Sequence, residues 1–128
     1  MNNLKKIAPT FLRIGIALVF LWFGWSQIHD AKQWIGFVPQ WVSDMSSLSL
    51  LTIVFLNGVF EIIFGSALLL GFKTRIVGFL LALHMLDISF IVGLNATGVR
   101  DFGLTFAAIT VWMNGMDAWT LDSFIKEE

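Results

Sequence analysis

Cysteine is absent from the 128 residues of the chain. Its absence excludes a disulfide framework, a thiol redox centre and a thiolate metal site. Charged residues are also few, at 13% of the chain, and a formal net charge of −1 argues against a nucleic-acid partner. Any redox function would therefore need a bound cofactor or a partner.

Apolar residues, in contrast, are in large excess. Hydrophobic residues make up 57% of the chain, with 13 Phe and 6 Trp, and the mean hydropathy is +0.81. A soluble fold of this size could not bury so much apolar surface. We therefore predict an all-α integral membrane protein with a single domain over residues 1–128, in which the bilayer supplies the missing interior.

Four apolar runs are long enough, or nearly so, to cross the hydrocarbon core as helices. The last is the shortest and would need tilt or local thinning of the bilayer. The first run follows two lysines and superficially resembles a signal peptide, but no small-residue cleavage site follows it, so we interpret it as a retained helix. The runs cover residues 10–28, 48–72, 76–94 and 99–116.

Basic residues set the predicted orientation of these helices. Lys5 and Lys6 precede the first run, and Lys73 and Arg75 lie in the tight turn between the second and third runs. By the positive-inside rule both segments are cytoplasmic. We therefore predict a four-helix bundle in the cell (inner) membrane, with both termini inside and the first loop, residues 29–47, outside.

The first loop is rich in aromatic residues, which favour the membrane–water boundary. It contains Trp34 and Trp41, and Pro39 interrupts any long helix. We expect a short segment that lies on the outer interface, and the alternative is a lid over a cavity between the helices. The tail, residues 117–128, is expected to form a brief interfacial helix or to fray.

Each apolar run carries one stripe of polar or small residues at helical spacing. Such stripes indicate a bundle with a polar interior and a lipid-facing exterior. In chain order the stripes are Arg13, Ala17, Phe20, Gly24 and Gln27; Asn57, Glu61 and Gly65, with Gly58 beside them; His84 and Asp87; and Arg100, Gly103, Ala107, Val111 and Asn114.

The third run has a second stripe on the side opposite its two polar residues. Small residues on this stripe would let another helix approach closely. That helix belongs either to the same chain or to a second copy in a homodimer. The stripe consists of Gly78, Ala82, Ser89 and Gly93.

Depth within the membrane predicts which polar residues meet. With a rise of ~1.5 Å per residue, Glu61 and His84 both fall near the midplane, and Asn57 and Asp87 lie closer to the outer surface. Arg100 begins the fourth helix at that surface. Because buried charges need partners, we predict that Glu61 contacts His84 and that Asp87 pairs with Arg100.

Several kinds of chemistry fit these residues. Buried polar pairs can simply fix helix register, whereas a carboxylate and an imidazole at the midplane can bind and protonate a quinone head group or relay a proton. A haem held by His29 and His84 is disfavoured because the two lie at different depths. Glu61, His84 and Asp87 are suitable ligand types for a metal, but the pattern is weak and we predict no metal site.

A sparse set of landmarks runs through nearly the whole chain: Arg13; Glu61 followed by Gly65, Leu69 and Gly71; Thr74-Arg75; Arg100-Asp101; and Leu121-Asp122. In these landmarks the sequence resembles the DoxX family, which implies a small four-helix membrane protein. Some members are linked to quinone-coupled sulfur oxidation, such as thiosulfate:quinone oxidoreductase, and others resemble accessory subunits or assembly factors. The resemblance therefore implies a fold more than a reaction. The pair His84 and Asp87 and the Trp-rich loop lie outside the pattern.

The leading hypothesis is a DoxX-like membrane component that binds a quinone or similar amphiphile within the bundle, as part of a redox-linked complex. The lipid bilayer is its main partner, and a homodimer and a soluble or membrane redox partner are also considered. The competing hypothesis is a non-enzymatic scaffold or assembly subunit, because no self-contained catalytic motif is present and no catalytic residue is assigned. The predicted ligand-binding residues are Glu61 and His84 at the head group, Asn57 beside them, Asp87 and Arg100 as tuning groups, and Trp34 and Trp41 at the entrance.

Overall fold

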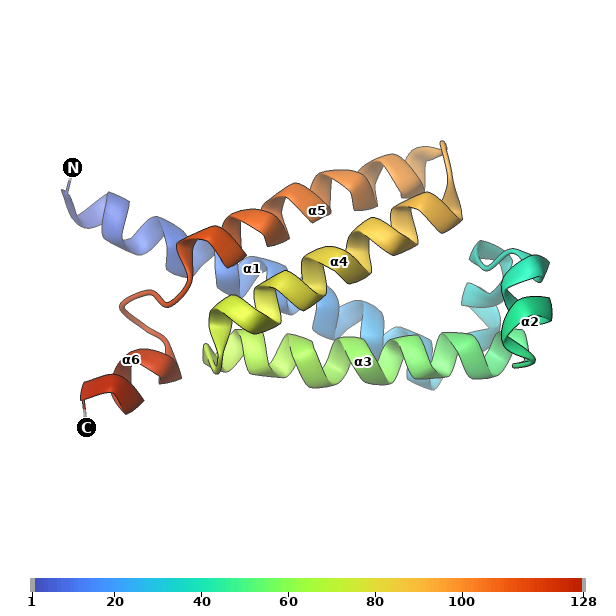
Figure 1. Ribbon diagram of the computed structural model, residues 1–128, viewed down its shortest axis with the longest axis horizontal. Helices are drawn as coiled ribbons and strands as arrows, with labels where there is room; N and C mark the ends of the chain where they lie inside the picture. The colour runs from blue at the N-terminus through green and yellow to red at the C-terminus, as the bar shows by residue number, and fades with distance from the viewer. Residues whose placement is uncertain (1, 128) are drawn as a thin grey trace.

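The computed structural model describes residues 2–127, which form helices without any strand. Four long helices lie alongside one another: α1 (Asn2–His29), α3 (Leu50–Leu70), α4 (Thr74–Val92) and α5 (Ala96–Asn114). Short helices close the two ends of the bundle: η1 (Ala31–Phe37) and α2 (Gln40–Ser46) lie at one end, and α6 (Leu121–Glu127) lies at the other, the end at which α1 starts (Figure 1). We refer to these as the η1–α2 end and the terminal end. The all-α prediction is confirmed.

The predicted apolar runs coincide with the four long helices, and local caps determine several helix ends. Ser49 caps α3 and Asn95 caps α5, each accepting a hydrogen bond from the backbone N–H three residues further on. Gly71 ends α3 with a φ of 71°, a left-handed conformation that glycine adopts without strain. α1 begins at Asn2, well before residue 10, because a polar first turn continues the helix and hydropathy does not detect it.

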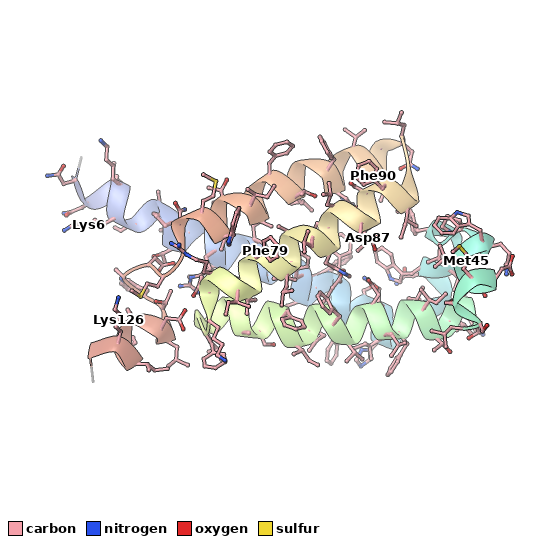
Figure 2. The ribbon with its side chains drawn as sticks, in the orientation of Figure 1. Lys6, Met45, Phe79, Asp87, Phe90 and Lys126 are labelled. Carbon is pink, nitrogen blue, oxygen red and sulfur yellow. The ribbon has the colours of Figure 1, made fainter. Side chains whose placement is uncertain are left out.

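Three of the long helices, α1, α3 and α4, are long and apolar enough by composition to cross a membrane. α5 has 19 residues but does not meet that measure, because Arg100 and Asp101 lie in its first turns. Large apolar side chains cover the outside of the bundle, among them Phe11, Trp22 and Phe90, the last of which is labelled in Figure 2. So extensive an exposed apolar surface is typical of a protein that contacts lipid.

α1 and α3 are in direct backbone contact through two glycines. A Cβ atom on Gly24 would lie 2.8 Å from the carbonyl oxygen of Gly58, and one on Gly58 would lie 2.9 Å from the carbonyl oxygen of Gly24. Such close approach is available only to residues without a side chain. The contact brings Gln27 of α1 within hydrogen-bond distance of Asn57 and Glu61 of α3.

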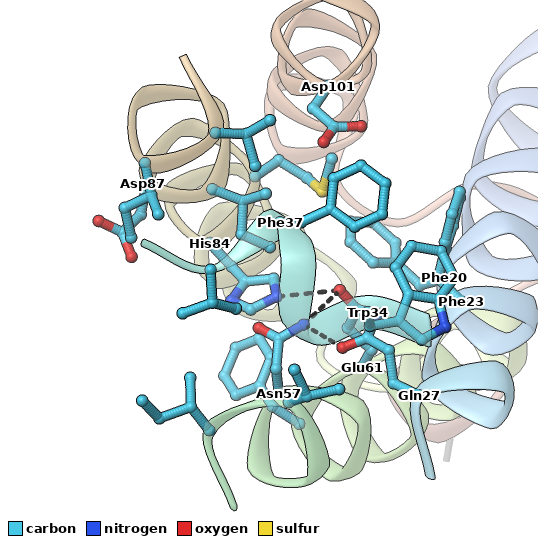
Figure 3. Close-up of a pocket in the computed structure, with 18 of the residues that line it drawn as sticks. Phe20, Phe23, Gln27, Trp34, Phe37, Asn57, Glu61, His84, Asp87 and Asp101 are labelled. Carbon is cyan, nitrogen blue, oxygen red and sulfur yellow. Dashed lines mark hydrogen bonds and ion pairs between the residues drawn. The ribbon is translucent and has the colours of Figure 1, made fainter. Parts of the chain in front are cut away.

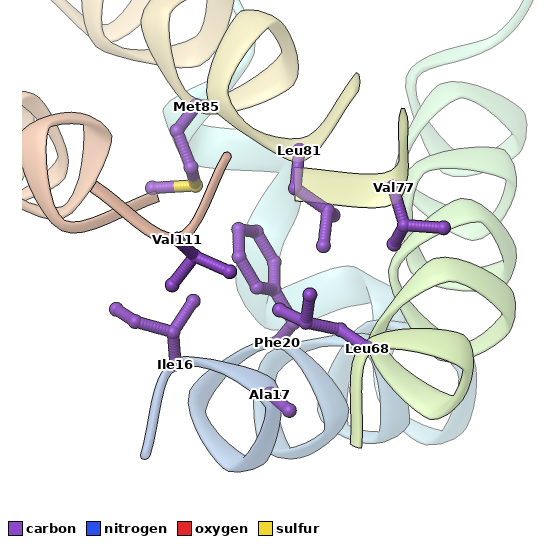
Figure 4. Packing of buried hydrophobic residues seen from close by; sticks show 8 residues of the cluster. All are labelled: Ile16, Ala17, Phe20, Leu68, Val77, Leu81, Met85 and Val111. Atoms are coloured by element: carbon purple, nitrogen blue, oxygen red, sulfur yellow. The ribbon is translucent and has the colours of Figure 1, made fainter. Parts of the chain in front are cut away.

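The apolar core joins all four long helices in the half of the bundle nearer the terminal end (Figure 4). It packs α4 and α5 on α1 and α3 there and leaves the polar residues of the stripes nearer the η1–α2 end. The buried residues of the core are Ile16, Ala17, Phe20, Leu68, Val77, Leu81, Met85 and Val111.

The stripe predicted for α5 is mostly wrong. Gly103 has nothing within 4 Å of its Cβ position, Asn114 is exposed, and only Val111 of that stripe is buried. Close packing on α4 determines which face of α5 is buried. The predicted stripe starts at Arg100, but this residue lies at the edge of the buried face and only its long side chain reaches inward. The buried residues of α5 are Gly98, Asp101, Thr105, Ala108 and Val111.

The small-residue stripe of α4 packs within the chain. A Cβ atom on Gly78 would lie 3.1 Å from the backbone nitrogen of Trp112 on α5, and Ala82 and Ser89 are buried. Gly93 instead ends α4, with a φ of 86°. Packing against a neighbour in the same chain is therefore what the stripe does, and its buried residues are not open to a second copy.

Residues 117–122, which we call the C-terminal latch, fasten the terminal end. The guanidinium of Arg13, which is 1% exposed, donates to Asp117 at 2.7 Å and to three backbone carbonyl oxygens, two of them at the end of α3. Asp122 accepts hydrogen bonds of 2.6 and 2.7 Å from two backbone N–H groups at the start of α4. The latch thus joins α1, α3 and α4.

The carboxyl groups of the latch are both more acidic than usual. Burial alone would raise the pKa of Asp117, but hydrogen bonds from Arg13, the Trp119 N–H and the Thr10 hydroxyl hold it below the ordinary value of 3.8. Burial would likewise raise the pKa of Asp122, but hydrogen bonds from the backbone N–H groups of Thr74 and Lys73 lower it below the ordinary value. The brief helix predicted in the tail is present as α6, and Glu128 lies outside the described residues.

Candidate functional site

Glu61 lies at the centre of a hydrogen-bonded cluster contributed by three helices (Figure 3). Gln27 Nε2 on α1 donates to Glu61 Oε2 at 3.0 Å. Asn57 Nδ2 donates to Glu61 Oε1 at 3.2 Å and to Gln27 Oε1 at 2.6 Å. His84 Nε2 on α4 lies 3.2 Å from Glu61 Oε1. The predicted contact between Glu61 and His84 is therefore present, and we call these four residues the Glu61 cluster.

The imidazole of His84 is held from two sides. Its ring lies 4.4 Å from the ring of Phe60, centroid to centroid, and its Nε2 faces the carboxylate of Glu61. An ionised carboxylate only accepts hydrogen bonds, so with Glu61 ionised the proton shared in this contact belongs to Nε2. Nδ1 is on the other side of the ring and makes no hydrogen bond within residues 2–127. Like the side-chain oxygen of Asn57, it is an atom of the cluster that has no partner among the described residues.

A cavity of about 410 Å³ adjoins the cluster in the half of the bundle near the η1–α2 end. All four long helices contribute to it, as do η1 and α2, and its size suits a small organic molecule. Apart from the polar residues its walls are aromatic and aliphatic: Phe20, Phe23, Trp34, Phe37 and Phe60, with Val19, Val38, Val42, Ile53, Val54, Leu56, Met85, Ile88, Ile91, Val92 and Leu104.

The first loop covers this cavity, which matches the predicted alternative of a lid. Trp34 forms part of the wall, where its Nε1 donates to Ser26 Oγ at 3.0 Å and its ring meets Phe23 edge-on at 5.4 Å. Trp41 is 54% exposed and is not among the residues that line the cavity, so its predicted place at the entrance stays a prediction. The orientation of α2 decides which way Trp41 points, and so short a helix has no periodicity that reveals it.

The predicted ion pair between Asp87 and Arg100 is not formed. Arg100 instead pairs with the adjacent Asp101, with 3.0 Å between Nη2 and Oδ1, and its Cζ lies 5.0 Å from the centre of the Phe23 ring. Asp101 is buried and Asp87 is exposed at the edge of the cavity. The cation thus lies with the buried acid of the two and leaves Asp87 without a basic partner among the described residues.

Two residues of the site are missing from the predicted set. Gln27 lies on the predicted stripe of α1, one turn after Gly24. Because a glycine on such a stripe indicates close contact with another helix, the amide one turn later could have been predicted to lie in the site. Asp101 directly follows Arg100, and neighbouring residues of a helix point to different faces, so spacing gave no signal for it. Contact of any of these residues with a ligand stays a prediction.

No metal or haem arrangement is formed by the candidate ligands. Within residues 2–127, no three His, Asp or Glu side chains come together around a position for a metal ion. His29 stacks on Trp25 with 3.8 Å between ring centroids and does not line the cavity that contains His84.

A protein-family model described as DoxX matches residues 8–94, from the first turns of α1 to just beyond α4. The match includes the whole Glu61 cluster and leaves α5 and α6 outside it. No curated protein and no solved structure matches the chain. Because the family model covers more than half of the 128 residues, this chain of apolar helices is a membrane protein that belongs to the DoxX family.

Proposed function

We propose that this DoxX-family protein binds the head group of a quinone, or of a similar membrane amphiphile, in the cavity beside the Glu61 cluster. The observation that carries the proposal is a cavity of about 410 Å³ whose walls are mainly apolar and which the polar Glu61 cluster also lines. A quinone head group has the matching character, a flat apolar ring with carbonyl oxygens at its edge. Because no cysteine is present to pass electrons, the protein would act as one component of a redox-linked complex.

In this proposal His84 is the residue that contacts a quinone oxygen. Its Nε2 faces Glu61, and its Nδ1 is free to donate or accept a hydrogen bond. Glu61 orients the ring and stabilises the positive charge of a protonated imidazole. His84 would therefore exchange a proton with the head group, while Glu61 acts through His84 rather than by touching the ligand. Arg100 and Asp87 would tune the charge of the cavity.

The proposal includes a topology of four membrane spans in the inner membrane, with both termini in the cytoplasm and one domain throughout. α5 is the fourth span, because it shares the core and the cavity with the three more apolar helices. All but Lys32 and Arg100 of the eight basic residues belong to segments at the terminal end, which by the positive-inside rule is cytoplasmic. The η1–α2 end then faces outward.

Introduced thiols test this topology directly, because the chain has no cysteine of its own. In intact cells, a membrane-impermeant maleimide should label an Asp44→Cys variant, in α2, and should leave a Lys126→Cys variant, in α6, unlabelled until the membrane is permeabilised. The reverse pattern, or equal labelling of the two variants before permeabilisation, would contradict the proposed orientation.

One observation favours the competing function of a scaffold. Both carboxylate oxygens of Glu61 and the carbonyl oxygen of Gln27 already have partners inside the cluster. A network satisfied in this way can hold α1, α3 and α4 in register without any ligand.

A Glu61→Gln variant separates the two functions. The amide keeps the shape of the side chain but removes the charge that orients His84, so a quinone should bind about tenfold more weakly or worse. Binding is measured on the purified protein in lipid nanodiscs, with ubiquinone and menaquinone analogues. Failure of the wild-type protein to bind any of them would support the scaffold.

If the Glu61→Gln variant does not fold, a variant that fills the cavity can still test whether a quinone binds there. Ile91→Trp fills the cavity without altering the cluster, and Phe90→Trp makes the matched change at the adjacent position, which is exposed. Quinone binding should be lost in the first variant and kept in the second. Equal binding by both would contradict the assignment of the cavity.

A further inference from the structure

The lining of the cavity carries more acid than base. Three carboxylates line it, those of Glu61, Asp87 and Asp101, against the guanidinium of Arg100 and the imidazole of His84. Arg100 is already bound to Asp101 through hydrogen bonds of 3.0 and 3.1 Å. Glu61 has His84 as its basic partner, so the acid of the lining that is left without a basic partner is Asp87. The charge balance therefore favours a cationic ligand over an anionic one.

Asp87 is the carboxylate of the cavity that has no partner within residues 2–127. Figure 3 shows it across the cavity from Phe23 and Gln27 of α1. It lies five residues before the end of α4 at Val92, about 7.5 Å along the helix axis. At that depth in a membrane an unpaired carboxylate is costly, and a cation on the ligand would supply the missing partner.

Aromatic rings line the same cavity from several sides. The faces of phenylalanine and tryptophan rings attract cations, and the guanidinium of Arg100 already lies over one of them, 5.0 Å from the centre of the Phe23 ring. Aromatic walls beside a carboxylate are the means by which proteins recognise organic ammonium groups. The other rings that line the cavity are Phe20, Trp34, Phe37 and Phe60.

We propose that the cavity binds hydrophobic organic cations, such as a protonated amine, a quaternary ammonium or a phosphonium carried on an apolar body. The positive charge lies near Asp87, and the apolar body lies between the aromatic rings. This binding rests on the cavity of the proposed function but does not require that a quinone bind there. A quinone and a cation that fill the same volume compete with each other.

Tetraphenylphosphonium tests the proposal, with tetraphenylborate as a probe of similar size and opposite charge. The full chain in phosphatidylcholine nanodiscs should bind the cation saturably, at one per chain in equilibrium dialysis, and should not bind the anion saturably. Asp87→Asn should weaken binding of the cation about tenfold, whereas Asp44→Asn, at an exposed position outside the cavity, should not. Because Asp87 has no partner among the side chains that the structure describes, its variant should keep the unfolding temperature of the wild type.

Three results would overturn the proposal: no saturable binding of the cation, saturable binding of the anion with equal affinity, or unchanged binding in the Asp87→Asn variant. The quinone experiment fails independently of this one. Binding of quinone without binding of tetraphenylphosphonium leaves the proposed function standing and removes the cation site. Binding of tetraphenylphosphonium without binding of quinone supports the cation site and contradicts the proposed function.

Discussion

Glu61 is a carboxylate in the middle of an apolar bundle, and no described lysine or arginine forms an ion pair with it. Its hydrogen-bond donors are the amides of Gln27 and Asn57 and the ring of His84. A lysine or arginine would give the carboxylate a permanent positive partner, whereas two amides and an imidazole hold it by hydrogen bonds without one. The proposed proton exchange with a ligand needs a cluster without a permanent cation, whereas a purely structural pair has no such need.

The glycine contact between α1 and α3 should be sensitive to a single methyl group. In Gly58→Ala the new Cβ would lie 2.9 Å from the carbonyl oxygen of Gly24, and backbone must move to admit it. The expected loss is about 1–3 kcal/mol of the free energy of unfolding, measured by denaturation in mixed micelles.

Gly15→Ala is the matched control for that prediction, since nothing lies within 4 Å of its Cβ position. It should be neutral or slightly stabilising, because alanine favours a helix more than glycine does. Equal stability of the Gly58→Ala and Gly15→Ala variants would show that the two helix backbones are not in contact.

The sequence predicts a contact between two residues correctly when their depth in the membrane is enough to determine it. It fails when a residue has two possible partners of opposite charge. Glu61 and His84 each lie near the middle of a long helix, so their meeting follows from helix rise. Arg100 has two acids within reach, and the burial of Asp101, which decides the outcome, depends on packing that no residue pattern records. The exposure of Trp41 depends in the same way on the path of a loop.

At the scale of elements, hydropathy locates the long helices well because a bilayer imposes a minimum apolar length. It does not locate the start of α1, which is polar, or the inward face of α5, where polar and small residues occur all round the helix. The C-terminal latch is also invisible to hydropathy. Its contacts join backbone groups of α3 and α4 to residues some 50 positions later in the chain, and they depend on tertiary structure.

The latch should make the protein sensitive to acid. The pKa values of Asp117 and Asp122 are lowered in the folded chain, so the folded state binds these protons less readily than the unfolded state does. The stability they contribute is fully present above their ordinary pKa of 3.8 and is lost as the pH falls through the lowered values. The double variant Asp117→Asn with Asp122→Asn should be less stable than the wild type at neutral pH.

The same double variant should lose less stability on acidification, from about pH 5 to pH 3. The unfolding temperature, measured over this range, checks the prediction. Asp44→Asn is the control, because Asp44 lies in α2 and makes no contact with the latch. If the double variant and the wild type responded to acid equally, the latch would not be the source of the pH dependence.

At the scale of the whole molecule, the bundle consists of two tight helix pairs. Gly24 and Gly58 join α1 to α3, and Gly78 brings α4 against Trp112 of α5. The core and the latch hold the two pairs together near the terminal end, while the cavity separates them near the η1–α2 end. The cavity therefore arises from how the pairs diverge, which no single helix encodes.

Distances between the two pairs should vary more at the η1–α2 end than at the terminal end. Spin labels at Leu51→Cys and Phe90→Cys should give a broad distance distribution, and labels at Leu70→Cys and Ile76→Cys a narrow one; all four positions are exposed. A cavity ligand should narrow the first distribution and leave the second unchanged. Equally narrow distributions without ligand would show that the two pairs form one rigid body.

The latch also has a consequence for how the chain is made. Arg13 and Asp117 are 104 positions apart in the sequence, and synthesis proceeds from the N-terminus. The guanidinium thus reaches the edge of the bilayer while most of the chain, including the carboxylate that will enclose it, is still untranslated. Until then it remains a hydrated charge that resists being drawn through the lipid. Only when residues 117–122 have been made can this temporary anchor become a buried tie, so a chain cut short before Asp117 would leave the guanidinium of Arg13 without the carboxylate that encloses it.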